Sequence, residues 1–311
     1  MRVLVTGGAG FIGSHIQDAL LDAGHEVVVV DDLSTGHREN VSERARFYQL
    51  DIRDERLREV FSSHEPEAVF HLAAQMDVRR SVREPIYDAQ ANILGSIHLL
   101  EMCRMHGARR IVYASTGGAI YGEPEHLPAD ENHPINPISQ YGISKHTVEH
   151  YLRLYWQNHG VSYLALRFPN VYGPRQDPHG EAGVVAIFSL QMLTGIQPVI
   201  FGDGSKTRDY VFIKDIVRAN LIGLDGTVVG VYNLGWGTEV TDFTIFDTVR
   251  AAVGSNVEPR YAPRRLGEVE RICLDARRAK QDLGWTPEIA LDTGIARAVE
   301  YYRANPHGFH V

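Results

Sequence analysis

The chain has 311 residues, of which 44% are hydrophobic and 23% charged, so it can form one large globular α/β domain with a smaller lobe. Its formal net charge of −8 argues against a nucleic-acid partner, and no apolar stretch approaches the roughly twenty residues that span a membrane. The two cysteines, Cys103 and Cys273, lie far apart and predict reduced packing residues in a cytoplasmic protein.

The N-terminal segment contains a nucleotide-binding pattern. Residues 2–6 form a short apolar run that predicts a buried strand, and residues 25–30 form a second. Between them we expect an amphipathic helix from about residue 12 to 23. The turn from strand to helix carries three glycines at three-residue spacing, with Phe11 and Ile12 between the last two: Gly7, Gly10 and Gly13.

Each part of this pattern suits a dinucleotide. Glycines allow a tight turn, close approach of the backbone to a pyrophosphate, and packing of the helix on the strand. The helix N-terminus presents N–H groups and the positive end of its dipole to the phosphates. Asp31 follows the second strand, where an acid accepts hydrogen bonds from the adenosine ribose hydroxyls. A carboxylate there would repel a 2′-phosphate, so NAD is favoured over NADP.

The alternation of strands and helices predicts the fold. Strand-like runs at 3–6, 27–31, 45–50, 68–72, 110–114 and 162–168 are separated by helical patterns. This order predicts parallel strands with right-handed helical crossovers, that is, a Rossmann-like doubly wound α/β sheet.

From about Asn170 the sequence changes, because Gly and Pro become frequent, and this indicates a smaller, loop-rich C-terminal lobe. The runs 210–213 and 230–234 resemble strands that could return to the first sheet, and 291–303 predicts an amphipathic helix. We therefore expect an NAD-binding domain at 1–169 plus about 211–236, and a substrate-binding lobe at 170–210 and 237–311.

Tyr141 and Lys145 are the candidates for catalysis. Four residues apart on a helix, they share one face. A lysine ammonium beside a phenol lowers the tyrosine pKa from its free value of about 10, which makes a base usable near neutral pH. Ser115 and Thr116 follow the strand at 110–114. Either hydroxyl could share a proton with a substrate oxygen in the same cleft, or could instead satisfy backbone groups in the turn.

These motifs together resemble the NAD-dependent epimerase/dehydratase family of extended short-chain dehydrogenases/reductases. The resemblance covers essentially the whole chain, and within the family it is strongest to the UDP-glucose 4-epimerases. It rests on Asn92 and on the stretches 6–13, 31–36, 51–52, 71–75, 141–145, 167–174 and 204–210. It implies an isomerase that interconverts UDP-galactose and UDP-glucose through a 4-keto sugar, with tightly bound NAD.

The resemblance also implies roles for individual residues. NAD would be bound by Gly7, Gly10, Phe11, Ile12, Gly13, Asp31, Asp32, Leu33, Ser34, Thr35, Gly36, Asp51, Ile52, Leu72, Ala73, Ala74, Gln75, Asn92, Tyr141, Lys145 and Phe168. The UDP-sugar would be bound by Asn170, Arg208, Tyr210, Arg265 and Glu268. Arginines suit a diphosphate because they form bidentate contacts, and Glu268 would accept from the uridine ribose. No metal is implied.

The chain departs from the family at the catalytic hydroxyl. The family usually has three hydroxyl residues in this turn, and the third is catalytic. Aligned on Tyr121, the third position here is Gly117. Spacing back from Tyr141 favours Thr116, while Ser115, or a reaction without a hydroxyl, stays open.

Three alternative functions stay open. The first is an epimerase of another UDP-sugar (UDP-GlcNAc/GalNAc or UDP-glucuronate), since Ile272 aligns with a position that limits N-acetyl bulk in some relatives. A nucleotide-sugar dehydratase needs an acid and a base beside the hydroxyl, but Gly117 and Gly118 follow Thr116. A non-catalytic NAD-binding regulator could keep the same fold.

Two further patterns lie on the helices. His146 to His150 matches the His-x-x-Glu-His pattern of some zinc proteases, but without an evident third ligand we expect a solvated or interface face. The helices around 89–106 and 141–159 carry apolar residues on more than one face. The resemblance implies that they pair in a homodimer through a four-helix bundle.

Overall fold

The computed structural model describes residues 1–179, 183–264 and 269–305. Its centre is a seven-stranded sheet in the order β11-β6-β5-β4-β1-β2-β3, with parallel neighbours throughout. The strands are β1 (Arg2–Thr6), β2 (Glu26–Asp31), β3 (Arg46–Gln49), β4 (Ala68–His71), β5 (Arg110–Thr116), β6 (Ser162–Phe168) and β11 (Gly230–Asn233). The predicted Rossmann-like sheet is confirmed, and every strand predicted before residue 170 belongs to it.

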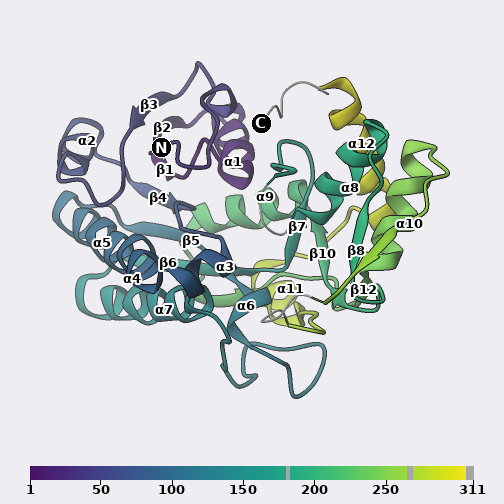
Figure 1. Cartoon of the computed structure of the whole chain (residues 1–311). Coiled ribbons are helices and arrows are strands. Elements are labelled where there is room, and N and C mark those ends of the chain that lie inside the picture. The colour runs from purple at the N-terminus through teal and green to yellow at the C-terminus, as the bar shows by residue number, and fades with distance from the viewer. Residues whose placement is uncertain (180–182, 265–268, 306–311) are drawn as a thin grey trace.

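Helices cover both faces of this sheet (Figure 1). The long helices are α1 (Phe11–Asp22) and α9 (Ile213–Ile222) on one face, and α2 (Leu57–His64), α5 (Gly95–His106) and α7 (Gln140–His159) on the other. Alternation along β1 explains the two layers, because Val3 and Val5 pack on the α1 side while Leu4 packs on the α5 side. No helix within the described residues is long and apolar enough to cross a membrane.

Short helical segments lie at the edges of this core. They are η1 (Arg38–Asn40), α3 (Val78–Arg83), α4 (Pro85–Ala89), the π-helix η2 (Gln90–Leu94), α6 (Gly117–Ile120), η3 (Gly223–Asp225) and α11 (Arg277–Leu283). A π-helix is rare and often occurs at a functional site, so we expect η2, which leads directly into α5, to contribute to the site.

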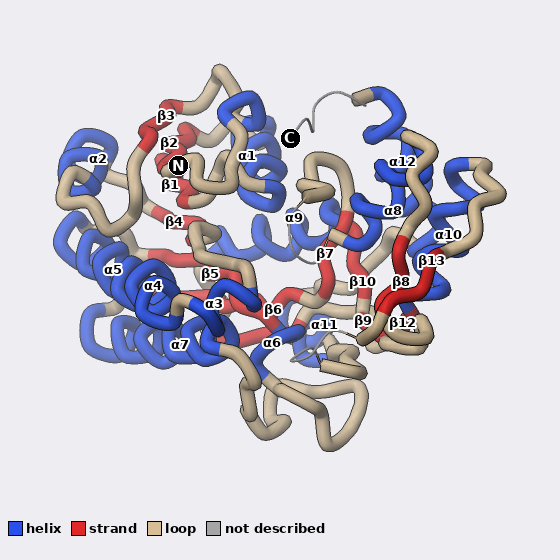
Figure 2. Tube along the Cα trace, viewed as in Figure 1, coloured by secondary structure: helices blue, strands red, loops and turns tan. Residues whose placement is uncertain are grey.

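A smaller lobe lies beside the carboxyl ends of the strands (Figure 2). Its helices α8 (Val184–Leu193), α10 (Asp242–Val253) and α12 (Leu291–Ala304) pack on one another. Its three small sheets pair β7 (Asn170–Tyr172) with β10 (Tyr210–Phe212), β8 (Val199–Phe201) with β13 (Arg260–Ala262), and β9 (Thr207–Arg208) with β12 (Val240–Thr241). The predicted C-terminal helix is confirmed.

The two later predicted strands behave differently. β11 joins the main sheet beside β6, but β10 does not, since it pairs with β7 outside that sheet. Pro169 separates β6 from β7, and because proline cannot donate a ladder hydrogen bond the chain leaves the sheet there. The division into two domains at the boundaries given above stays a prediction.

Strand order places the site. β1 lies between β4 and β2, so the direction of winding reverses at β1. At such a reversal the crossovers diverge to opposite faces and leave a crevice at the carboxyl ends of the strands. The glycine turn after β1, the loop after β4 and the end of β5 all lie along this edge.

Candidate active site

The loops after β1 and β4 lie against each other. Gly7 has φ +71°, and a β-carbon there would lie 2.6 Å from the Ala73 amide nitrogen, while one at Gly13 would lie 2.1 Å from the Gly7 carbonyl oxygen. A β-carbon at Gly10 would meet only the Gly7 oxygen, at 3.3 Å. The turn is therefore tightly packed at Gly7 and Gly13, while Gly10, at the N-terminus of α1, has little packed against it. Such exposed backbone N–H groups suit a pyrophosphate.

Asp31 closes this turn from the end of β2. Its Oδ2 accepts the Ala9 N–H and its Oδ1 accepts the Leu33 N–H, both at 2.9 Å. Burial raises the pKa of Asp31. A β-carbon at Gly36 would lie 2.8 Å from the Ala9 β-carbon, so the loop after β2 also packs on the glycine turn. Since each oxygen uses one hydrogen bond, lone pairs remain for ribose hydroxyls.

The remaining NAD candidates occupy neighbouring loops. Asp32 accepts hydrogen bonds from the Ser34 amide and hydroxyl. Asp51 pairs with Arg53, whose hydrogen bonds hold the pKa of the Asp51 carboxyl below its usual value. The loop from Leu72 to Gln75 follows β4, and Ile52 and Phe168 are buried.

Asn92 lies on the π-helix and holds the loop after β4. Its Oδ1 accepts the Gln75 N–H at 2.8 Å, and its Nδ2 donates to the Gln75 carbonyl at 2.9 Å. This pair of hydrogen bonds fixes the backbone of the loop at Gln75. Asn92 therefore lies beside the expected cofactor site and orients the loop that lines it.

Tyr141 and Lys145 lie in the first two turns of α7, which begins where the Ser139 hydroxyl accepts the Gly142 N–H. Lys145 is 3% exposed, and its Nζ donates to the Ala114 carbonyl at 2.9 Å. The Nζ lies 4.8 Å from the Tyr113 ring centroid and 5.9 Å from that of Tyr141. Burial lowers the pKa of Lys145 to about 8.

The two candidate hydroxyls differ in direction. Ser115 is buried, and its Oγ donates to Glu149 Oε1 at 2.6 Å. Thr116 is half-buried at the end of β5 and its side chain does not cap α6. A β-carbon at Gly118 would lie 3.9 Å from both Thr116 Oγ1 and Asn170 Oδ1, so these two atoms border the same space. This arrangement brings the hydroxyl of Thr116, and not that of Ser115, to the space beside Gly118 that Asn170 also borders.

Glu149 is a buried residue of this helix that the sequence reasoning missed. It accepts hydrogen bonds from Arg167 Nε at 3.0 Å and Nη2 at 2.7 Å. Burial acts to raise the pKa of Glu149, but hydrogen bonds from His146 and Arg167 hold this pKa at about 2. Its spacing of four residues after Lys145 was a usable signal, because it continues the face of α7 that carries Tyr141 and Lys145.

The side chains of the zinc-protease pattern on α7 contact other protein groups. Glu149 points inward to Arg167, and His146 Nδ1 lies 3.2 Å from its carboxylate. The Nε2 atoms of His146 and His150 lie 3.1 Å apart. Across 1–179, 183–264 and 269–305 there is no group of three or more His, Cys, Asp or Glu side chains that could hold a metal ion.

The substrate candidates lie in the small lobe. Arg208 of β9 donates through Nη1 to the Thr207 carbonyl at 2.7 Å. Its neighbour Asp209 is buried and accepts the N–H groups of Trp236, Gly237 and Leu274, while burial raises the Asp209 pKa to about 6. Tyr210 is buried as well. The two other candidates, Arg265 and Glu268, lie outside the described residues.

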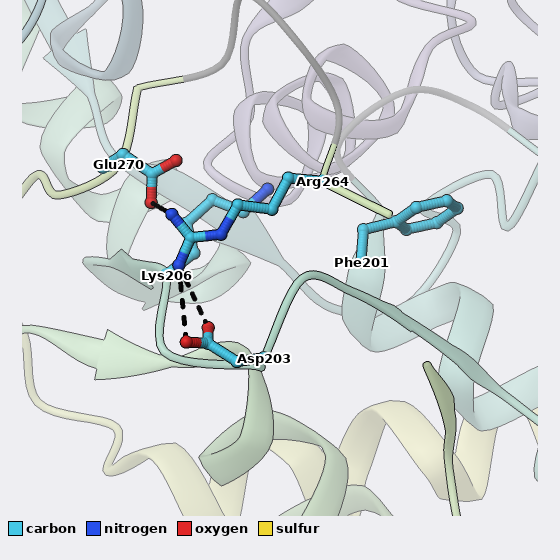
Figure 3. Close-up of a pocket in the computed structure, with 5 residues that line it drawn as sticks. All are labelled: Phe201, Asp203, Lys206, Arg264 and Glu270. Carbon is cyan, nitrogen blue, oxygen red and sulfur yellow. Dashed lines mark hydrogen bonds and ion pairs between the residues drawn. The ribbon is translucent and has the colours of Figure 1, made fainter. Parts of the chain in front are cut away.

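A small polar pocket lies in the same lobe (Figure 3). Arg264 crosses it, donating through Nη1 to Glu270 Oε2 at 3.0 Å and through Nη2 to Asp203 Oδ1 at 3.3 Å. The lining residues are Phe201, Asp203, Lys206, Arg264 and Glu270. The sequence reasoning missed this pocket, although the turn at 202–204 after a short strand was a signal for a loop at a strand end.

Gly117, the departure from the family pattern, is explained by its neighbour. A β-carbon at Gly117 would lie 2.2 Å from Leu274 Cδ1. Leu274 is fully buried with Ile120 and Ile272, and its segment bridges to Ala129. Leu274 therefore fills the space that a third side chain in this turn would need.

The fold and this site define a class of protein. A doubly wound parallel sheet with a glycine-rich first turn, and a Tyr–Lys pair on the helix that packs against the end of β5, are the features of a short-chain dehydrogenase/reductase. The family model described as NAD dependent epimerase/dehydratase family matches residues 3–235. The chain belongs to this family.

Named relatives are similar over nearly the whole chain. A UDP-glucose 4-epimerase of Mycolicibacterium smegmatis is 46% identical, covering 97% of this chain and 99% of its own. The crystal structure of a UDP-glucose 4-epimerase from Thermotoga maritima with UDP-glucose has a TM-score of 0.96 and 48% identity, covering 98% and 99%. A UDP-glucose 4-epimerase from Thermus thermophilus, in complex with NAD, has a TM-score of 0.93 and 45% identity, covering 97% and 99%.

The contact between Gly117 and Leu274 predicts a difference between two adjacent glycines. Gly117→Ala should lower the free energy of unfolding by roughly 1–3 kcal/mol, because its methyl group overlaps a buried leucine. Gly118→Ala is the matched control and should keep wild-type stability, since its nearest neighbours lie at 3.9 Å. Urea unfolding measures both. Equal stabilities of the two variants would contradict this packing.

Proposed function

We propose that this chain is a UDP-glucose 4-epimerase that interconverts UDP-galactose and UDP-glucose with bound NAD. The observation that carries the proposal is the buried ammonium of Lys145, 5.9 Å from the Tyr141 ring, at the edge of the sheet where the glycine turn lies. A buried lysine beside a tyrosine is an arrangement that favours a phenolate base. The named relatives support the choice of reaction and substrate.

The cofactor residues fit NAD. Gly7, Gly10 and Gly13 leave bare backbone for the pyrophosphate, and Asp31 keeps lone pairs for the adenosine ribose. When bound, NAD supplies an acceptor that can take a hydride from the sugar C4 and return it. Lys145 keeps donor protons beyond its hydrogen bond to Ala114, and these suit the nicotinamide ribose hydroxyls.

Proton transfer falls to Tyr141 and Thr116. The Tyr141 phenolate removes the proton of the sugar 4-hydroxyl and returns it when the 4-keto sugar is reduced on its other face. The Thr116 hydroxyl donates a hydrogen bond to the same sugar oxygen. We prefer Thr116 to Ser115 because the Ser115 hydroxyl is already donated to Glu149. The same turn offers Gly117 and Gly118 where a dehydratase needs carboxylates, which disfavours that alternative.

Nucleotide binding holds the substrate while its sugar turns. We assign the diphosphate to Arg208, and the sugar nucleotide also to Asn170 and Tyr210. Arg265 and Glu268, which lie outside the described residues, keep in this proposal the roles that the resemblance implies. Binding energy from a part of the substrate that does not react can hold the 4-keto intermediate during rotation. Ile272 is 2% exposed and packs with Leu274. The proposal that its bulk bears on acceptance of N-acetyl sugars rests on the resemblance to the family.

We also propose a homodimer that pairs α5 and α7 of two copies as a four-helix bundle. On α7, Ile143 is 49% exposed and Leu154 is 48% exposed, and their spacing places them on one face. Leu94, the last residue of the π-helix that leads into α5, is 57% exposed. Exposed apolar side chains that gather on one face favour an interface. The two buried, unbridged cysteines fit the proposed cytoplasmic location.

Replacing the base tests the function. Tyr141→Phe should convert UDP-galactose to UDP-glucose roughly 10²–10⁴-fold more slowly than wild type, because general-base catalysis is lost. NAD should still copurify, since the phenol is one of many cofactor contacts. The assay contains no added NAD and separates the two sugar nucleotides. Near-normal turnover by Tyr141→Phe would contradict the assignment of Tyr141 as the base. No turnover by the wild type would favour the alternative of a non-catalytic NAD-binding regulator.

The dimer is tested by placing a charge on its proposed interface. Leu154→Glu should give a monomer of 34.8 kDa in light scattering, where the wild type should give twice that mass. Ile196→Glu is the control, because Ile196 is also exposed, at 56%, but belongs to the small lobe. A wild-type monomer, or a Leu154→Glu dimer, would rule out this interface.

A further inference from the structure

Asp88 is a buried carboxylate next to the catalytic helix. It lies on α4 and is 0% exposed. Its Oδ2 accepts the Ser144 hydroxyl of α7, and its Oδ1 accepts both Asn92 Nδ2 of the π-helix and Gln75 Nε2 of the loop after β4, each at 3.0 Å. Three donors suit an ionised carboxylate, which can only accept. Asp88 thus connects the loop after β4 (called the cofactor loop below), the π-helix η2 and α7 (called the catalytic helix below).

These contacts place the Asp88 carboxylate at the turn of α7 that carries the buried Lys145 ammonium. Ser144 directly precedes Lys145, so the hydrogen bond from Ser144 fixes Asp88 against the same turn of α7. Burial disfavours the charged form of Lys145, and Asp88 is the charged side chain that acts in the opposite direction. An uncompensated buried ammonium loses its proton readily, so a fixed carboxylate is needed to retain it.

The other groups near Lys145 do not supply this charge. The Tyr113 phenol of β5 stays neutral, because burial raises its pKa well above the usual value. The His71 imidazole of β4 is neutral, since burial lowers its pKa to about 3. On α7 itself, Glu149 forms an ion pair with Arg167. Tyr141 is the phenol that the Lys145 ammonium is proposed to activate.

We propose that Asp88 is a positioning residue for the reaction, which keeps the Lys145 ammonium charged beside Tyr141 and ties the cofactor loop at Gln75 to the catalytic helix at Ser144. It touches neither sugar nor reacting atoms. This inference rests on the proposed function for its catalytic consequence, but its effect on Lys145 is a property of the protein alone.

The lysine content of the chain allows that property to be measured directly. The only lysines are Lys145, Lys206, Lys214 and Lys280. In the NAD-bound protein labelled with ¹³C-lysine, the Lys145 signal is assigned by its loss in Lys145→Met and then titrated with pH. We expect a wild-type midpoint near the lowered pKa of about 8 and a lower midpoint in Asp88→Asn.

Kinetics give a second readout. In Asp88→Asn, kcat for UDP-galactose at pH 8 should fall about tenfold, because the fraction of Lys145 that is protonated at this pH should be about tenfold smaller. The alkaline limb of its pH profile should move to lower pH. KM should stay unchanged, because Asp88 does not contact the sugar nucleotide. Asp88→Ala, which leaves room for water beside the three donors, replaces Asp88→Asn if that variant does not fold.

A buried aspartate elsewhere serves as the matched control. Asp215 of α9 is 2% exposed and accepts the N–H groups of Glu288 and Ile289, but it lies on the other face of the sheet. Asp215→Asn should lower stability without moving the Lys145 midpoint or the pH profile. An unchanged Lys145 midpoint in a folded, NAD-bound Asp88 variant overturns the proposal. Absence of turnover by the wild type, with the midpoint shifted in the variant, overturns only the proposed function.

Discussion

The buried ammonium of Lys145 is the constraint on which the site depends. Removing such a charge from water costs on the order of several kcal/mol, so its surroundings have to offset that cost. The Ala114 carbonyl accepts from it, and the Tyr113 and Tyr141 rings lie within cation–π range. β5 must end beside the start of α7 for these contacts to form, which makes the geometry of the sheet a condition for the proposed chemistry.

Features set by local pattern were predictable from the sequence. Five of the six strands before residue 170 are buried on both faces, and continuous apolar runs reveal such strands without knowledge of their neighbours. The exception is β3 at the edge of the sheet, which is largely exposed. The glycine turn was equally predictable, since the spacing of its glycines and the acid at Asp31 belong to one strand–helix–strand unit. The placement of Tyr141 and Lys145 on one face of a helix follows from their spacing of four residues.

Features set by distant contacts were not predictable in this way. The direction of the Ser115 hydroxyl depends on Glu149 and Arg167, which come from another helix and strand. Gly117 is explained only by Leu274, more than 150 residues later in the sequence. β10 resembled a strand of the main sheet, but its partner is β7, because the chain leaves the sheet at Pro169. Sequence patterns identify an element and leave its partners open.

Lys145 thus links the parts of the site, since the end of β5, the face of α7 and the carboxylate of Asp88 all bear on its charge. The most direct test is the ionisation of Tyr141 in the NAD-bound protein. The ultraviolet difference spectrum between wild type and Tyr141→Phe, followed with pH, reports the phenolate of this one tyrosine. We predict ionisation near neutral pH, well below the free pKa of about 10. Titration of Tyr141 near 10 would contradict a lysine-stabilised base.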